Sequence, residues 1–151
     1  MGKEDIMIAK YYYKDGTITD EYIKRELHRV DGPAIDSTDG NNSWYLNGRL
    51  HRVDGPAVEG SQGSYWYMNG LRHRATGPAV EGNDGHAEWH VNGKLHRVDG
   101  PAVIFSSREF GWFIDDKNYS EEQFNQLIKE TRDLPLALRL IDPREWVRRM
   151  V

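Results

Sequence analysis

The chain has 151 residues, with 20 Lys or Arg against 24 Asp or Glu and a net charge of −4. This acidic balance argues against a protein that coats nucleic acid, and the absence of Cys excludes disulfides, thiolate metal sites and cysteine catalysis. No apolar run reaches the ~20 residues of a membrane helix, and residues 1–16 lack the apolar centre of a signal peptide, so we expect a cytoplasmic protein.

A strand is predicted over residues 10–16 ("KYYYKDG"), and the motif "LHRVDGPA" first occurs after it, at residue 27. Counting back from His28 by the spacing of the later copies puts Glu21 at the position of a recurring Trp. Lys24 and Arg25 then fall where later copies have Asn-Gly. We interpret this segment as a degenerate first unit, because the terminal unit of a repeat protein lacks a neighbour on one side.

Three fuller copies of one unit follow, beginning at residues 44, 66 and 89. They read "WYLNGRLHRVDGPA", "WYMNGLRHRATGPA" and "WHVNGKLHRVDGPA" and recur about every 23 residues, a period typical of stacked repeats. We assign a structural role to the recurring Trp44, Trp66, Trp89, Trp112, His51, His73, His96, Asn47, Gly48, Gly55 and Pro56.

Each Asn-Gly pair predicts a two-residue β-hairpin, since a type I′ turn needs positive φ at both central residues. This loop length places Trp44 opposite His51 on the two strands. We expect a second turn at "DGPA", where Gly55 takes positive φ and Pro56 donates no hydrogen bond. A short "AVE" strand should follow it.

The repeated His residues could be functional or structural. Equivalent atoms of neighbouring units would lie roughly 10 Å apart, too far for one shared metal. We therefore expect each imidazole to stack on the Trp face, with its nitrogens bonded to backbone in the next turn. Asp54 has a structural interpretation too, as an acceptor that closes its own turn, because Thr76 takes its place in the third copy.

The repeated Arg residues leave two interpretations open. They could pair with acids of the array, Arg97 with Glu88 across the hairpin or others with Glu59 and Glu81. They could also form a row of guanidinium groups for phosphates or an acidic partner. The candidate partner-binding residues are this row together with a C-terminal basic group: Arg29, Arg52, Arg74, Arg97, Arg144, Arg148 and Arg149.

The repeats end in a hairpin with Asp115-Asp116 at its turn and Tyr119 in the His position. A helix is predicted over about 121–132, since Ser120 and Gln123 form a capping box and Phe124, Leu127 and Ile128 share one face. A second helix should begin after Asp142-Pro143. We thus divide the chain into a repeat array, 1–119, and a helical cap, 120–151, through which a homodimer could form.

Sequence signatures of catalysis are missing. The chain has no phosphate-binding loop, no Gly-x-Ser-x-Gly and no His-Glu-x-x-His motif. We predict no catalytic residue, no metal site and no cofactor, and hence a binding protein whose partner is a protein. Two alternatives are a small-ligand or nucleotide-binding protein that uses the Arg row and aromatic faces, and an enzyme with a site between array and helices.

The hairpin unit resembles the MORN (membrane occupation and recognition nexus) repeat over residues 10–119. This resemblance implies stacked hairpins in a single elongated sheet. With the 23-residue period and the helical segment above, we expect a mainly β fold: an antiparallel β-hairpin repeat array in one elongated twisted sheet, with a C-terminal α-helical cap. The "NGxLHRxDGPA" motif and "YSEEQF" also resemble repeats of uncharacterised phage and bacterial proteins. That likeness implies an accessory protein, such as an inhibitor of a host defence or replication protein.

Overall fold

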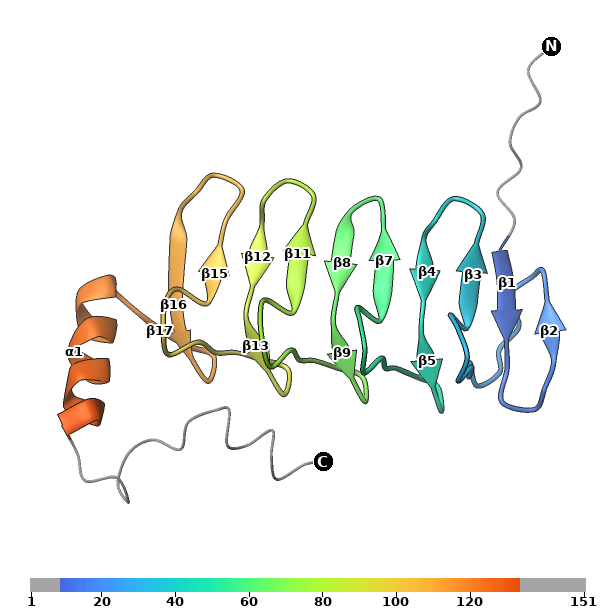
Figure 1. Cartoon of the computed structure of the whole chain (residues 1–151), viewed down its shortest axis with the longest axis horizontal. Coiled ribbons are helices and arrows are strands. Elements are labelled where there is room, and N and C mark those ends of the chain that lie inside the picture. Colours follow the sequence, from blue (N-terminus) through green and yellow to red (C-terminus); the bar gives the residue numbers. More distant parts are fainter. Residues whose placement is uncertain (1–8, 134–151) are drawn as a thin grey trace, which may run out of the picture.

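The computed structural model describes residues 9–133, and over this range it confirms a mainly β, antiparallel repeat architecture that ends in one helix (Figure 1). The first strands are β1 (Ala9–Tyr12), β2 (Ile18–Thr19), β3 (Ile35–Ser37), β4 (Asn42–Ser43), β5 (Tyr45–Leu46), β6 (Arg49–Leu50), β7 (Val58–Gly60) and β8 (Gly63–Tyr65). The others are β9 (Tyr67–Met68), β10 (Leu71–Arg72), β11 (Val80–Gly82), β12 (Ala87–Glu88), β13 (His90–Val91), β14 (Lys94–Leu95), β15 (Val103–Ile104), β16 (Phe110–Ile114) and β17 (Lys117–Tyr119). The helix is α1 (Glu121–Asp133).

Most strands form one long sheet in the order β17-β16-β15-β12-β11-β8-β7-β4-β3-β1-β2. Each repeat contributes one hairpin to it, for example β7–β8 with Val58 opposite Tyr65, and these hairpins stand side by side along the array (Figure 1). Neighbouring repeats join through antiparallel pairs such as β4–β7, where Ser43 lies opposite Val58. The sheet therefore grows by one hairpin per repeat.

The Asn-Gly hairpins form a second row of two-stranded pairs, which joins the long sheet only at its last hairpin. They are the two-stranded pairs β5–β6, β9–β10 and β13–β14, and β16–β17 continues the row at the end. Backbone hydrogen bonds join successive hairpins: Gly48 N–H donates to Leu27 O at 2.9 Å, and Arg29 N–H donates to Tyr45 O at 3.0 Å. Most of the strands thus lie in the expected elongated sheet, but each repeat is divided between that sheet and a small hairpin.

The turn geometry follows the predicted chemistry. Asn47 has φ 51° and Gly48 φ 70°, and Leu46 lies opposite Arg49 as a two-residue type I′ loop requires. His51 N–H donates to Trp44 O at 3.0 Å, which confirms the predicted cross-strand pair. In the last hairpin both Asp residues of the turn also have positive φ.

Gly55 does not have the predicted positive φ, so the expected reason for a glycine there is wrong. A Cβ at Gly55 would lie 2.9 Å from Cζ of Arg52 and 3.1 Å from its Nε. The same crowding recurs at Gly32, Gly77 and Gly100, each against the Arg of its own unit. Glycine at this position therefore leaves room for the guanidinium group of its own unit.

The alanines of the "GPA" motif are the most buried residues of the array. Ala34, Ala57, Ala79 and Ala102 are all 0% exposed. Each Ala lies where the two rows meet. Its carbonyl accepts a hydrogen bond from the backbone N–H of the aromatic residue that precedes the small hairpin, as Ala57 does from Trp44 at 2.8 Å. A larger side chain would push the two rows apart.

The first unit is built around Tyr12, not Glu21, so the predicted alignment of this unit is wrong. His28 N–H donates to Tyr12 O at 3.0 Å, and Tyr12 N–H donates to Ala34 O at 2.8 Å, the pattern that Trp44 has in the next unit. Tyr13 bridges Leu27. Glu21, Lys24 and Arg25 lie in the long connection between these two positions, and this insertion defeats an alignment by constant spacing.

Helix α1 begins where the capping box predicted. Ser120 N–H donates to Gln123 Oε1 at 2.9 Å, and Gln123 N–H donates back to Ser120 Oγ at 3.2 Å. Phe124 is 3% exposed, with its ring centre 4.8 Å from that of Trp112. The helix therefore covers the last Trp of the array.

The second predicted helix and the basic residues Arg144, Arg148 and Arg149 lie outside the described residues. In the part of the chain that the structure describes, no helix is long and apolar enough to cross a membrane.

Candidate functional site

The repeated Arg side chains lie on the repeated aromatic rings. Cζ of Arg52 lies 4.0 Å from the centre of the Trp44 ring, a cation–π contact. The equivalent pairs are Arg29 on Tyr12 at 4.0 Å, Arg74 on Trp66 at 3.8 Å and Arg97 on Trp89 at 4.0 Å. The Trp faces therefore carry guanidinium groups, and the expectation that imidazoles stack there is wrong.

Hydrogen bonds within the same unit engage these guanidinium groups. Arg52 Nη1 donates to Pro56 O at 3.2 Å and to Glu59 Oε1 at 2.8 Å, and its Nε donates to Asp54 Oδ1 at 3.1 Å. Asp54 thus accepts from a guanidinium group instead of closing a turn through a backbone N–H. The interpretation in which the Arg residues pair with acids of the array accounts for these contacts.

Arg97 pairs with Asp99 at 2.7 Å and not with Glu88, as was expected from the hairpin spacing. Its unit has Ile104 where the preceding units have Glu59 and Glu81, so the second carboxylate is missing. The prediction for Glu88 failed because Arg97 N–H donates to Phe113 O of the next hairpin at 3.2 Å, so the pairing with the strand of Glu88 ends at His96.

Each repeated His bonds to the turn of the next unit, as predicted. Nδ1 of His28 accepts from Asn47 N–H at 3.1 Å, and Nδ1 of His73 accepts from Asn92 N–H at 3.1 Å. Burial lowers the pKa of His73, which favours the neutral ring that can accept this bond. The His row therefore ties consecutive units together.

One charged cluster interrupts the repeat pattern on the third and fourth units. Arg72 stands where other units have Leu50 and Leu95, and His90 stands where they have Tyr45 and Tyr67. The two side chains meet at one carboxylate: Arg72 Nη1 lies 2.9 Å and His90 Nε2 2.8 Å from Glu88 Oε2. On the other oxygen, His86 Nε2 lies 3.0 Å from Oε1.

This carboxylate is fully engaged. The hydrogen bond from His90, the hydrogen bond from His86 and the charge of Arg72 lower the pKa of Glu88 to about 2, against the opposing effect of burial. His90 is only 6% exposed. A carboxylate with so low a pKa stays ionised near neutral pH, which suits a structural ion pair better than a proton-transferring group.

A polar hollow lies beside the cluster. Its lining comprises Ser61, Gln62, Tyr65, Arg72, Val80, Gly82, Asn83, Asp84, His86 and Glu88. No group of His, Asp or Glu side chains within residues 9–133 is arranged to hold a metal ion. Sequence reasoning missed this cluster, although the replacement of Leu by Arg72 and of Tyr by His90 was a visible signal.

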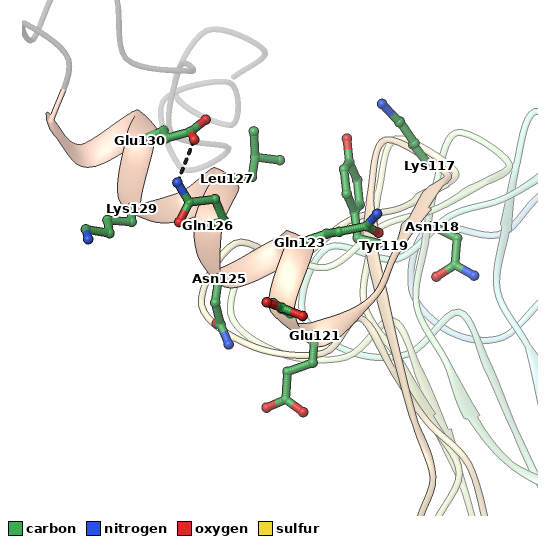
Figure 2. Close-up of a pocket in the computed structure, with 11 residues that line it drawn as sticks. Lys117, Asn118, Tyr119, Glu121, Gln123, Asn125, Gln126, Leu127, Lys129 and Glu130 are labelled. Atoms are coloured by element: carbon green, nitrogen blue, oxygen red, sulfur yellow. Dashed lines mark hydrogen bonds between the residues drawn. The ribbon is translucent and has the colours of Figure 1, made fainter.

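The place expected for an enzyme site, between the array and the helical segment, is an open hollow along β17 and α1. Figure 2 shows its side chains spread along the helix and the strand instead of converging on one point. Gln126 donates to Glu130 within the helix at 2.7 Å, and Nζ of Lys117 lies 5.1 Å from the centre of the Tyr119 ring. These contacts form no nucleophile–base pair.

Comparison with known proteins gives no match: no family model, curated protein or solved structure is similar to this chain. The candidate surfaces therefore rest on the geometry alone.

Proposed function

We propose that the chain is a non-enzymatic repeat protein that binds another protein through the surface of the array. The repeated Trp, Asn-Gly, His, Arg, Gly and Ala residues all have a role in the fold, as the hydrogen bonds, stacking and burial above establish. What the fold leaves unexplained is the residue after each Arg, and that residue supports the proposal.

This residue is Val30, Val53, Ala75 and Val98 in successive units; it is exposed in the first three units and half-buried in the fourth. Val30 and Val53 are each 81% exposed, beside the exposed carboxylates of Asp31 and Asp54. One exposed Val is ordinary on a protein surface, but exposed apolar side chains at the same position of three successive units, Val30, Val53 and Ala75, form a regular row. In the fourth unit Val98 and Phe124 of α1 line the same hollow, so an apolar side chain of a partner can contact this position of the unit.

The nucleotide alternative is weaker than binding of a protein. It needs the Arg row and the aromatic faces to be free, whereas each guanidinium group occupies its ring and donates to a Pro carbonyl, as in Arg74 with Trp66 and Pro78. A role as an inhibitor that blocks a host protein by contact belongs to the same proposal and would use the same row.

Photo-crosslinking tests the proposal. A photoreactive amino acid at position 53 should give specific adducts when the full chain is incubated with cell lysate. The same group at Lys94, an exposed residue of β14, serves as the matched control and should not.

The double variant Val30→Ser/Val53→Ser should keep its melting temperature and lose the partner identified at position 53. Equal adducts at both positions, or a partner retained by the double variant, would contradict a binding role for the row.

A further inference from the structure

The hairpin β15–β16 has a tip unlike those of the other units. The preceding tips are polar and small: Ser37, Gly60 and Gly82 begin the loop, and Gly40, Gly63 and Gly85 lie before its end. The last tip has Phe105 at the first of these positions and Arg108 at the second, with Phe110 shortly after. Three neighbouring positions therefore change together.

Arg108 adopts a backbone conformation that the other units reserve for glycine. Its φ is 67°, close to the 81° of Gly40 and the 87° of Gly85. An L-residue with a long side chain is disfavoured in this region, and such outliers gather at functional positions. The fold alone would be served better by glycine.

Both Phe side chains of this tip are exposed, Phe105 by 42% and Phe110 by 57%, although the ring of Phe105 also lies against His86, with 6.1 Å between the ring centres. They do not belong to the core, to which this part of the chain contributes Ala102, Val103 and Ile114. Exposed aromatic rings beside an Arg are the residue types that dominate binding energy in protein interfaces.

The charges at the tips of the long-sheet hairpins indicate the chemistry of the partner. Two of the other tips carry an acid, Asp39 and Asp84, whereas the acids at the strand ends, Asp36, Glu59 and Glu81, are paired with Arg29, Arg52 and Arg74. Arg108 is the cation of the last tip, and its guanidinium group has no hydrogen-bond or ion-pair partner among the residues that the structure describes. Glu109 in the same tip accepts from Ser107 Oγ at 3.0 Å. An acidic segment would therefore meet a cation at this tip, where Glu109 is bonded to Ser107, and a carboxylate at the tips of Asp39 and Asp84.

We infer that the β15–β16 tip is a docking site for an acidic protein segment, with Phe105 and Phe110 entering its apolar positions and Arg108 pairing with a carboxylate. The inference deepens the proposed binding function by naming a second surface and the chemistry of its partner. It does not depend on the exposed residues that follow each repeated Arg, such as Val30 and Val53.

The test uses the full chain and a library of random 12-residue peptides. Panning against the wild type should enrich sequences that combine Asp or Glu with Leu, Phe or Trp. A fluorescein-labelled selected peptide should then bind wild type at least about thirtyfold more tightly than Phe105→Ser/Phe110→Ser, the effect of losing interface hot spots. Ile18→Ser, which removes a similarly exposed apolar side chain at the other end of the array, should bind like wild type.

Arg108→Gly separates binding from folding. It restores the residue of the other units, so its melting temperature should equal or exceed that of the wild type while peptide affinity falls about tenfold or more. Enriched peptides without acidic bias, or equal affinity for Arg108→Gly, would overturn the inference.

Two further outcomes would overturn it in favour of another occupant. Binding of phosphatidylserine vesicles that Arg108→Gly abolishes would assign the tip to a membrane surface. Concentration-dependent dimers, seen by light scattering and lost in Arg108→Gly, would assign it to a second copy of the chain. The two proposals can fail separately. Val30→Ser/Val53→Ser tests only the proposed function, whereas Phe105→Ser/Phe110→Ser and Arg108→Gly test only the tip.

Discussion

The guanidinium group of Arg74 lies 3.8 Å from the centre of the Trp66 ring and donates to the carbonyl of Pro78 at 3.0 Å. This one side chain connects the small hairpin of its unit to the "GPA" segment that leads into the long sheet. Lys could supply the charge but neither the flat stacking surface nor the paired donors.

Arg74→Lys should therefore destabilise the chain by about 1–2 kcal/mol, because it weakens the stacking and loses a charged hydrogen bond. Urea unfolding followed by Trp fluorescence measures the change. Arg49→Lys, an exposed substitution on β6, should alter stability by less than about 0.5 kcal/mol. Equal effects of the two substitutions would show that the Trp66 contact contributes little.

Gly55→Ala should destabilise by about 1–3 kcal/mol, because the added Cβ meets Arg52 Cζ at 2.9 Å although φ is ordinary. Combining it with Arg52→Ala removes the atom that clashes. The two changes should cost less together than the sum of their separate costs, which a double-mutant cycle measures. Strict additivity would show that some other constraint requires glycine here.

Asn47→Ala should lower the stability of the chain by about 1 kcal/mol, since Asn47 has φ 51° in the type I′ turn. Asn47→Gly should be close to neutral, because glycine accepts this φ and keeps the backbone N–H that donates to His28. Thermal unfolding of the two variants compares them directly. A neutral Asn47→Ala would rule out strain at this position as the reason for Asn.

Glu88 should make stability sensitive to acid. Its pKa in the folded chain is about 2, below the ordinary 4.5, so its contribution is complete above pH 4.5 and is lost as the pH falls towards 2. Glu88→Gln should remove on the order of 2 kcal/mol at neutral pH and flatten the loss of stability across that window. Denaturant midpoints at pH 7, 4.5 and 3 give the slope. Glu122→Gln, on the exposed side of α1, controls for the loss of one charge. If Glu88→Gln loses stability between pH 7 and pH 3 as steeply as the wild type does, the role of the cluster is refuted.

Local chemistry made much of the fold predictable. Asn47-Gly48 specifies its turn through φ alone, and the turn length then fixes which residue lies opposite Trp44. The capping box of Ser120 and Gln123 likewise needs only neighbouring residues. In each case the interaction that decides the structure lies within a few positions of the chain.

The predictions that were wrong concern contacts that cannot be read from the spacing of a repeat motif. Gly55 is explained by the path of a side chain three residues away, and Tyr12 pairs with His28 across an insertion. The Glu88 cluster joins residues from different units, so only the fold could show that Arg72 and His90 point to one carboxylate. At the β15–β16 tip the sequence shows Arg108 in place of the glycine, but the positive φ of Arg108 and the exposure of the two Phe rings are visible only in the structure.

The hydrogen bond from each Asn turn to the His of the unit before it has a consequence for how such a chain can change in length. Every unit meets its neighbours through the same pair of surfaces, so one whole unit can be duplicated or deleted while both ends of the array keep their partners. Each such event would move α1 relative to β1 by about 10 Å, two strand widths, and leave the remaining turns unaltered. The distance between the two ends is therefore a quantity that gene duplication can adjust in fixed steps.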